Sequence, residues 1–335
     1  MIPSPPFTAT ATAHPNIALI KYWGKAVSNS TNEPAVSSLS ITLDTLVTET
    51  TVRFDPALSA DSLLLNGIED RRRLPRISAA LDTLRSVAGV TDFCEVVSNN
   101  NFPTSAGLAS SASGFAALVA ATNCALNMGL NARQQSMLAR GMSGSAARSV
   151  FGGFAKIQCQ PGLSALSPWG AAYAEPVAPS SHWPLAVCIG IASETEKAIG
   201  STEGMERSRL TSPYYNAWLE HNDADVREAE QAISNKDFAR LAELSEMSCL
   251  KMHALAMASD PGLLYWQGVT VDAIHLVRDL RYRGVPVFFT IDAGPQIKAV
   301  CLPEAADTVA DALSSLNGIK KVVRCGLGQG VRVRV

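Results

Sequence analysis

Residues 99–118, NNNFPTSAGLASSASGFAAL, join a Pro-Thr-Ser turn and a loop of small residues directly to an alanine-rich segment. Residues 112–126 contain few helix breakers and predict a helix, with Ser110 or Ser111 at its N-cap. The first turn of such a helix leaves backbone N–H groups without helical partners and carries a partial positive charge. An anion is therefore the natural ligand of this stretch.

The loop ahead of the helix favours a phosphate in particular. Gly107 and Ala109 have little or no side chain, so an anion can approach the backbone N–H groups, and the neighbouring serine hydroxyls add donors. An ordinary capped helix after a loop explains the same residues equally well. The stretch lacks the lysine of the GxxxxGK[ST] phosphate loop, so any cation that neutralises a phosphate must come from elsewhere in the chain.

The composition describes a compact protein with a generous core and no broad basic face. The chain has 335 residues, of which 47% are hydrophobic and 17% charged, and this length suits about two domains. Its formal net charge of −2 argues against a nucleic-acid surface. The N-terminus lacks the basic start and apolar run of a signal peptide, and no apolar run is long enough to predict a membrane span.

Cysteine and histidine usage indicates a reducing compartment and no zinc site. The seven cysteines are scattered and never spaced CxxC, which predicts reduced, mostly buried thiols in a cytoplasmic protein. The five histidines include no HxxxH pair. We expect no protein-held metal from this pattern.

Hydrophobic patterning predicts a mixed α+β protein. In the first half we expect a strand, a turn and a buried segment over 8–21, and a strand or hairpin pair over 36–54. A short strand with a turn should follow at 63–67, and a further strand at 93–98. Helices are expected at 77–87 and 132–140. A shift to Pro, Ser, Ala and Trp at 161–184 indicates a linker or domain edge. Beyond it we expect strands at 185–192, 285–291, 298–302 and 321–335, and helices at 214–257 (broken near 235–236), 269–283 and 305–316. This order suits a sandwich with a largely antiparallel sheet.

Two basic segments are candidates for the missing positive charge. Residues 21–25, KYWGK, place two lysines and two aromatic residues around a glycine just after a buried segment. A solvated loop with Trp23 as a core anchor is the simpler interpretation. The cluster Arg71, Arg72, Arg73 and Arg76 is mostly solvent-facing in our interpretation, with one arginine reaching a ligand.

An arginine and an aspartate follow turns of small residues elsewhere in the chain. Arg148 lies in SGSAARS, residues 143–149, and offers a rigid fork suited to a carboxylate or phosphate, although a salt bridge is an equal alternative. Asp292 ends the apolar segment VPVFFTI and precedes a tight turn, which is a frequent place for catalytic carboxylates. Its alternative is a hydrogen bond to the turn backbone. Residues 193–212 predict a polar loop able to close over a site.

Together these candidates form a set for phosphoryl transfer. Such transfer needs positioning and charge neutralisation more than covalent chemistry, together with a group that orients the attacking hydroxyl. Asp292 suits that last role by accepting the hydrogen bond or proton of the hydroxyl. Magnesium would bridge the phosphates of a nucleoside triphosphate and need few protein ligands.

Four motifs resemble the signatures of the diphosphomevalonate decarboxylase family of the GHMP kinase superfamily. They are NIALIKYWGK (16–25), NNFPTSAGLASSASG (100–114), SGSAARS (143–149) and DAGP (292–295), and the similarity covers essentially the whole chain. The first and third are much more specific than the serine loop, which the wider superfamily shares. The resemblance implies ATP- and Mg²⁺-dependent conversion of 5-diphosphomevalonate to isopentenyl diphosphate, through phosphorylation of the 3-hydroxyl, in the mevalonate pathway of isoprenoid biosynthesis.

The resemblance also implies roles for individual residues. Asp292 would approach the 3-hydroxyl, Arg148 and Asn16 would hold the substrate carboxylate, and Lys21 would lie near the transferred phosphoryl group or near Asp292. The substrate-binding residues would be Tyr22, Trp23, Gly24, Lys25, Arg76, Ser143, Gly144, Ser145, Ala146, Ala147, Ser201, Thr202 and Met205, and the ATP-binding residues Ser105, Gly107, Leu108, Ala109, Ser110 and Ser111.

One segment departs from the family pattern. Members commonly carry an arginine at the position of Thr202 or just after the methionine, where this chain has Glu206. A carboxylate beside a diphosphate is unfavourable unless it points away or pairs with a base. Three alternatives therefore stay open: a 5-phosphomevalonate decarboxylase that makes isopentenyl phosphate, a mevalonate 3-kinase, and a GHMP-fold binding protein without turnover.

The resemblance finally implies an architecture and an assembly. The fold expected is an α+β, GHMP kinase-like two-domain fold, with a ribosomal protein S5 domain 2-like N-terminal domain over 1–180 and a ferredoxin-like α/β sandwich over 181–335. A cytoplasmic homodimer is implied, with a small-molecule substrate and with neither nucleic acid nor membrane as partner.

Overall fold

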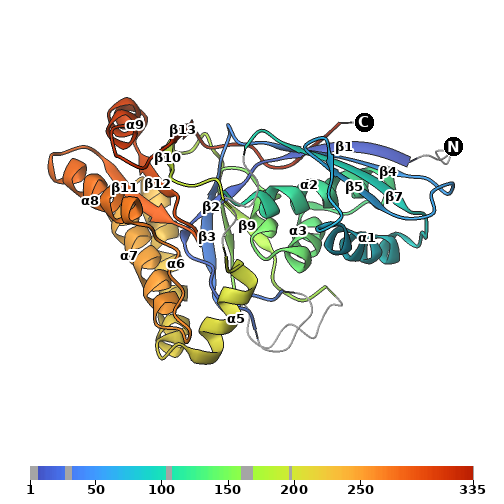
Figure 1. The fold of residues 1–335 in the computed structure, drawn as a ribbon, viewed down its shortest axis with the longest axis horizontal. Coiled ribbons are helices and arrows are strands. Elements are labelled where there is room, and N and C mark those ends of the chain that lie inside the picture. Colours follow the sequence, from blue (N-terminus) through green and yellow to red (C-terminus); the bar gives the residue numbers. More distant parts are fainter. Residues whose placement is uncertain (1–6, 27–31, 103–107, 160–168, 196–197, 335) are drawn as a thin grey trace.

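The computed structural model describes residues 7–26, 32–102, 108–159, 169–195 and 198–334. Within them the chain forms an α+β structure of two lobes, with helices packed on three sheets (Figure 1). No helix in these ranges is both long and apolar enough to cross a membrane.

The first sheet forms one lobe with helices on one face. Its order is β14-β1-β4-β7-β5-β6, with β1 Phe7–Ala13, β4 Thr48–Phe54, β5 Ser62–Leu65, β6 Ile68–Glu69, β7 Cys94–Asn100 and β14 Arg332–Arg334. The sequence FTATATA of β1 alternates, so its alanines are buried against the helices while its threonines are partly exposed. The alanine-rich α2 (Ser110–Ala125) packs on this alanine face, together with α1 (Leu74–Ala88) and α3 (Ala132–Met142).

The second sheet lies between the two lobes. Its order is β2-β3-β8-β9, with β2 Asn16–Ile20, β3 Ser38–Thr42, β8 Phe154–Ile157 and β9 Ala174–Ala178. Both β2 and β3 are buried along their whole length, because α6 (Tyr215–Asn235) and α7 (Phe238–Met257) cover one face and the short α4 (Ala146–Ser149) contacts the sheet as well.

The third sheet carries the second lobe. Its strands run antiparallel in the order β11-β12-β10-β13, with β10 Ala186–Ile191, β11 Val287–Ile291, β12 Ile297–Cys301 and β13 Lys321–Cys325. A core under this sheet includes residues of α8 (Gly268–Tyr282) and α9 (Ala306–Ser314), and a 3₁₀ turn at Pro303–Ala305 leads into α9. The edge strand β11 lies against α7.

The end of the chain returns to the first lobe. After β13, Leu327 forms a bridge with Leu43, and β14 then pairs with β1. Gly328 makes this crossing possible, because a Cβ there would lie 2.0 Å from the carbonyl oxygen of Leu43. The last strand therefore ties the two lobes together.

Most expected elements are confirmed, and three expectations are wrong. The segment 36–54 is no hairpin: β3 is buried on both faces and joins the second sheet, whereas β4 alternates and joins the first. Neither Ser110 nor Ser111 is the N-cap of α2; the cap is Ala109, with φ 56°, and no side chain caps the helix.

The third error concerns residues 193–212, which are not one polar loop. Ser201–Thr211 form the helix α5, although two glycines and low hydrophobicity argue against a helix there. Tertiary contacts override that propensity. A Cβ on Gly204 would lie 2.3 Å from the Tyr265 hydroxyl, and Trp23 Nε1 donates to Ser208 Oγ at 3.0 Å.

Candidate active site

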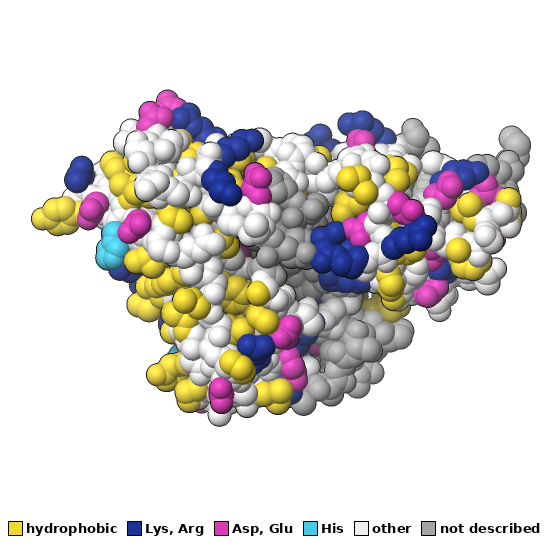
Figure 2. All heavy atoms as spheres, in the orientation of Figure 1, with side chains coloured by type: hydrophobic (Ala, Val, Ile, Leu, Met, Phe, Trp, Pro, Cys, Tyr) yellow, Lys and Arg dark blue, Asp and Glu magenta, His cyan; other side chains and the backbone are white. Residues whose placement is uncertain are grey.

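A cavity of about 850 Å³ lies between the lobes and collects most of the predicted site residues. In the space-filling view a patch of Lys and Arg side chains borders the depression between the two halves of the molecule (Figure 2). The predicted residues that line the cavity are Asn16, Lys21, Tyr22, Trp23, Lys25, Arg76, Ala109, Ser110, Ser111, Ser143, Gly144, Ser145, Arg148, Ser201, Thr202, Met205 and Asp292.

Four predicted residues lie behind the cavity wall. Leu108, Ala146 and Ala147 are buried in the hydrophobic core, where their apolar side chains belong. Gly24 has φ +122°, and a Cβ there would lie 2.6 Å from the Tyr215 hydroxyl, so it shapes the turn. Ser105 and Gly107 fall outside the described residues.

Two helices direct their first turns at the cavity. At the start of α2, Ala109, Ser110 and Ser111 line it, and no side chain caps the helix. At the start of α5, Ser201 and Thr202 line it, again without a side-chain cap. The partial positive charge at the start of each helix therefore favours an anion at both positions.

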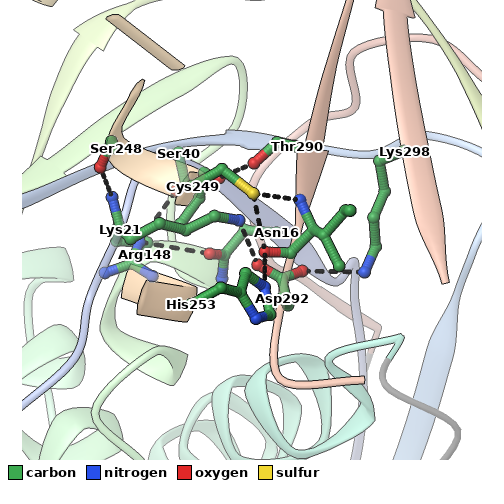
Figure 3. Close-up of polar contacts among 12 residues, drawn as sticks. Asn16, Lys21, Ser40, Arg148, Ser248, Cys249, His253, Thr290, Asp292 and Lys298 are labelled. Atoms are coloured by element: carbon green, nitrogen blue, oxygen red, sulfur yellow. Dashed lines mark hydrogen bonds and ion pairs between the residues drawn. The ribbon is translucent and has the colours of Figure 1, made fainter. Parts of the chain in front are cut away.

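Asp292 lies where the lobes meet and is held by two lysines. Lys21 Nζ lies 2.7 Å from Asp292 Oδ1, and Lys298 Nζ lies 3.1 Å from Oδ2. Figure 3 shows the two ammonium groups reaching the carboxylate from opposite sides. Burial alone would raise the pKa of Asp292, but Lys21 and Lys298 outweigh it and hold that pKa well below its usual range. The carboxylate is therefore ionised at neutral pH, and its side chain keeps 27% exposure.

The pairing of β11 with β12 places Lys298 next to Asp292. Thr290 pairs with Lys298 across the two strands, so the DAGPQ turn brings Lys298 back beside the carboxylate. Sequence reasoning did not single out Lys298, because a lysine at the start of an apolar strand gives no sign that it pairs with Asp292. The pairing of the hairpin was the signal able to find it.

Helix α7 supports both members of the Lys21–Asp292 pair. Ser248 Oγ accepts the backbone N–H of Lys21 at 2.9 Å, and Cys249 Sγ accepts the backbone N–H of Ile291 at 3.2 Å. His253 Nε2 donates to the carbonyl oxygen of Ile291 at 3.2 Å, and burial, reinforced by Lys21, lowers the pKa of His253 to about 3. Helix α7 thus fixes the backbone of Lys21 and that of Ile291, the residue before Asp292 (Figure 3).

Arg148 is a buried guanidinium with neutral partners. It is only 2% exposed, donates from Nε to Asn16 Oδ1 at 3.2 Å and to Ser40 Oγ at 3.0 Å, and from Nη1 to Ser38 Oγ at 2.6 Å. Burial lowers the pKa of Arg148 to about 10, against the opposing effect of Tyr22 and Asp292. No carboxylate lies within ion-pair distance of it in the described part of the chain. The site is therefore prepared for an anionic ligand.

Asn16 is oriented so that its amide oxygen faces Arg148. Its Nδ2 donates to the Ser145 carbonyl oxygen at 2.9 Å and to Ser149 Oγ at 2.8 Å. Both donors of the amide are engaged, so the direction of the side chain is fixed. Asn16, Arg148 and the 143–149 segment form one rigid wall of the cavity.

A second group of cations lies near the Ser143–Gly144 turn. Burial, and after it the neighbouring Arg76, lowers the pKa of Lys25 against the opposing effect of Glu206. Arg76 donates to the Met142 carbonyl oxygen at 2.9 Å and lies over the Phe115 ring. Glu206 is exposed and forms an ion pair with Arg209 at 2.6 Å, so the carboxylate that departs from the family pattern is neutralised.

Tyr22 lines the same cavity and places its hydroxyl beside Gly144, without a hydrogen-bond partner among the described residues. Its Oη is buried with no hydrogen-bond partner, and burial raises the pKa of Tyr22 to about 12. A Cβ on Gly144 would lie 2.4 Å from this hydroxyl, so only glycine allows the ring to stand there. The hydroxyl is thus a donor without a protein acceptor.

The structure adds cavity residues that the sequence did not single out. Arg72 was predicted only as one member of a basic cluster. The others are mostly small or apolar, which left no signal: Ala18, Asn32, Met142, Ala198, Gly200, Met252 and Ala293. A second cavity of about 460 Å³ shares Arg72, Arg76, Ser110 and Ser111 with the first and is otherwise largely apolar.

The residues fit a nucleotide better than a metal bound by protein alone. No group of three or more His, Cys, Asp or Glu side chains able to hold a metal ion occurs in the described ranges. Among the lining residues that the structure describes, Asp292 is the one carboxylate, and both of its oxygens contact lysines. The phosphates of a bound nucleotide would therefore supply most ligands of Mg²⁺.

Comparison with known proteins gives consistent relatives over nearly the whole chain. Residues 13–164 match the model of the diphosphomevalonate decarboxylase-like N-terminal domain, and residues 187–326 match that of the mevalonate 5-diphosphate decarboxylase C-terminal domain. The chain is 37% identical to diphosphomevalonate decarboxylase mvd1 of Aspergillus fumigatus, over 93% of this chain and 81% of that protein. It is 36% identical to the human diphosphomevalonate decarboxylase, over 92% and 79%.

Solved structures agree with these relatives. A structure described as "MDDEF in complex with MVAPP, AMPPCP and Magnesium" superposes with a TM-score of 0.90 at 39% identity, covering 98% of this chain and 99% of that one. The mevalonate diphosphate decarboxylase of Staphylococcus aureus superposes with a TM-score of 0.91 at 37% identity, covering 98% of both chains.

Proposed function

Because the chain belongs to the diphosphomevalonate decarboxylase family, whose reaction is the ATP-dependent decarboxylation of mevalonate diphosphate, we propose that Asp292, Arg148, Lys21 and Asn16 form its reacting centre. The observation that carries this proposal is the shared cavity. Asp292 and Arg148 line it together with the uncapped start of α2. A hydroxyl, a carboxylate and a nucleotide phosphate can therefore be held within one enclosed space.

The chemistry explains why these groups are needed. A 3-hydroxy acid loses carbon dioxide readily only when its hydroxyl becomes a good leaving group, so the γ-phosphoryl group of ATP is first transferred to that oxygen. The phosphate then departs with the electron pair of the C3–O bond, and C3 becomes electron-deficient. The bond to the carboxylate breaks, its electron pair forms the double bond, and carbon dioxide leaves. The products are isopentenyl diphosphate, carbon dioxide, phosphate and ADP.

Asp292 would act on the substrate hydroxyl as an anion. Its depressed pKa makes it a weak proton acceptor, so its main contributions are a hydrogen bond from the hydroxyl and a negative charge beside the electron-deficient C3. Lys21, whose Nζ lies 2.7 Å from Asp292 Oδ1, is close enough to reach a phosphoryl group arriving at that hydroxyl. It would neutralise the charge transferred with it.

Arg148 would hold the substrate carboxylate until it leaves. The guanidinium is fixed by Asn16, Ser38 and Ser40 at Nε and Nη1, which leaves Nη2 to face an anion. Both Arg148 and Asn16 line the cavity, so the carboxylate would lie between them and Asp292. A buried cation with neutral protein partners gains most from such a ligand.

The diphosphate tail and the nucleotide would occupy neighbouring parts of the site. Tyr22, Lys25, Arg76 and the start of α5 suit the two phosphates of the substrate, and the pairing of Glu206 with Arg209 removes the obstacle to a diphosphate. The start of α2 suits the ATP phosphates, and the second, largely apolar cavity suits the base and ribose. Bound Mg²⁺ would neutralise phosphate charge there.

Three further properties stay proposals on the same premise. We place the domain division between residues 180 and 181, with β14 returning to the first lobe. We also propose a cytoplasmic location, in keeping with seven unpaired cysteines, and a homodimer, which light scattering of the purified protein would test.

A coupled assay for ADP and carbon dioxide tests the function. We expect one ADP and one carbon dioxide for each mevalonate diphosphate consumed, and neither product with mevalonate alone. Carbon dioxide released only from 5-phosphomevalonate, and not from mevalonate diphosphate, would contradict the proposed substrate. ADP without carbon dioxide would indicate a kinase, and no ADP would indicate a binding protein.

A further inference from the structure

Lys298 is a charged residue at a position that the fold gives no reason to charge. It lies in β12, whose sequence IKAVC is buried throughout, and its side chain is only 1% exposed. Burying an ammonium group is costly, and an apolar side chain of similar volume would serve a strand at least as well. The charge therefore needs an explanation outside the stability of the sheet.

The two lysines that bind Asp292 differ in what else they can reach. Lys21 lines the cavity and contacts Oδ1 at 2.7 Å, so it faces any ligand that enters. Lys298 contacts Oδ2 at 3.1 Å from the other side and is not among the lining residues. Figure 3 shows Lys298 reaching Asp292 from the side opposite Lys21 and Arg148. One lysine can exchange partners with a ligand and the other cannot.

The other groups around Asp292 do not duplicate Lys298. Burial raises the pKa of Cys249 to about 11 and lowers the pKa of His253 to about 3, so both are neutral at physiological pH. Among the described residues, Arg148 also acts on Asp292 through space, but its own hydrogen bonds go to the neutral side chains of Asn16, Ser38 and Ser40. If Lys21 moved to a phosphate, Lys298 would be the cation still in contact with the carboxylate.

We propose that Lys298 is a positioning residue that serves as the standing counter-ion of Asp292, and that it frees Lys21 to move from Oδ1 to the transferred phosphoryl group. This rests on the proposed roles of Asp292 and Lys21. With Lys298 in place, Asp292 stays ionised and keeps its orientation after Lys21 leaves, and Oδ1 turns to the substrate hydroxyl. Without it, the same departure leaves a buried carboxylate unpaired, and the carboxylate takes up a proton instead.

A titration without substrate tests this directly. In Lys21→Met, which imitates the departure of Lys21, the ¹³C resonance of the Asp292 carboxyl, assigned with Asp292→Asn, should remain at its ionised position in mildly acidic solution. In Lys21→Met/Lys298→Met the same resonance should titrate about one pH unit higher or more. Identical titrations in the two variants would overturn the proposal. Because no reaction is involved, the result does not depend on the proposed function.

Kinetics of single variants provide the second test. Lys298→Met should lower kcat by about 10- to 100-fold, as the loss of a group that orients a catalytic residue commonly does, while KM for both substrates changes little. The loss should deepen as the pH falls, because Asp292 then protonates during turnover. Lys298→Arg, which keeps the charge, should recover a large part of kcat.

A matched control separates this role from simple stabilisation. Lys251 forms a more exposed pair with Asp225 at 2.8 Å on α7 and α6, outside the cavity, so Lys251→Met should leave kcat and its pH profile unchanged. Lys298→Met should also retain the melting temperature of the wild type, since Lys21 still pairs with Asp292 and methionine fills the space of the lysine. A lower melting temperature with unchanged kcat and pH profile would show Lys298 to be structural and overturn the proposal.

Discussion

Two buried ion pairs of equal length serve different purposes in this molecule. Arg140 Nη2 and Glu33 Oε1 lie 2.7 Å apart, as do Lys21 Nζ and Asp292 Oδ1. Around the first pair, Arg140 Nε donates to the Ala172 carbonyl oxygen at 2.6 Å, and Glu33 accepts the backbone N–H of Ala171 at 2.9 Å. Around the second pair, Asp292 is held by lysines and faces the cavity at 27% exposure.

The difference lies in how completely each pair is enclosed. Glu33 and Arg140 are 7% and 0% exposed and fasten the 169–172 segment to the lobe, where a Cβ on Gly170 would lie 1.8 Å from Glu33. Their hydrogen-bonding capacity is used within the protein. Asp292 and the nearby Arg148 line the cavity and keep hydrogen-bonding capacity that a ligand can use. Enclosure marks a structural pair, and incomplete satisfaction marks a reactive one.

The largest effect should follow removal of the reactive charge. Asp292→Asn should lower kcat by about 10⁴-fold, because the amide keeps the shape of the carboxylate and loses the charge that favours C3. Nucleotide binding should remain nearly intact. Measuring ADP release and nucleotide affinity together checks this, and retained turnover would mean that the reacting hydroxyl lies elsewhere.

The enclosed pair should respond in stability instead of catalysis. Glu33→Gln leaves Arg140 as a buried cation without its carboxylate, which should lower the free energy of unfolding by about 3–5 kcal/mol. The kcat of the folded fraction should stay within a few-fold of the wild type. Urea unfolding and active-site titration would measure both quantities. A stable variant with lost activity would erase the distinction between the two pairs.

A smaller loss of activity should come from changing the shape of the cationic group at position 148. Arg148→Lys keeps a positive charge but cannot reproduce the planar fork that Asn16, Ser38 and Ser40 orient, so kcat/KM should fall by about 100-fold. Arg133→Lys is a suitable control, because Arg133 stacks on Tyr173 away from the cavity. Equal kinetics for Arg148→Lys and the wild type would remove Arg148 from the proposed centre.

The smallest effect is a pH dependence of stability. The pKa of Asp292 is lower in the folded protein than in an unfolded chain, so its ionised form contributes stability above the ordinary carboxyl pKa. That contribution is lost as the pH falls towards the folded-state pKa. The stability difference between wild type and Asp292→Asn should therefore shrink on acidification below about pH 4. A difference that grows on acidification would contradict the sign of the shift.

The sequence singled out the candidates for the reacting centre more readily than the residues that support them. Asp292 and Arg148 follow strand-end and loop signals, and the KYWGK and SGSAARS motifs resemble a known family, so their roles were accessible from local pattern. Lys298 meets Asp292 only through the pairing of β11 with β12, and the Ser248–Cys249–His253 face of α7 contacts residues far away in the chain. No local spacing encodes such contacts.

The wrong predictions of secondary structure also come from contacts that the local sequence does not encode. The α5 helix forms because Gly204 packs against Tyr265 and Trp23, in spite of a weak local propensity. Among the described residues no side chain caps α2, whose first turn lines the cavity, where a capping serine would compete with an anion. Sequence rules describe stable, satisfied structure, and they fail where the site departs from it.

A crystal structure with mevalonate diphosphate bound would test the central claim most directly. We expect the substrate carboxylate within hydrogen-bond distance of Arg148 and its 3-hydroxyl within the same distance of Asp292, with the Glu33–Arg140 pair unchanged. A substrate whose carboxylate and hydroxyl contact neither residue would contradict the account.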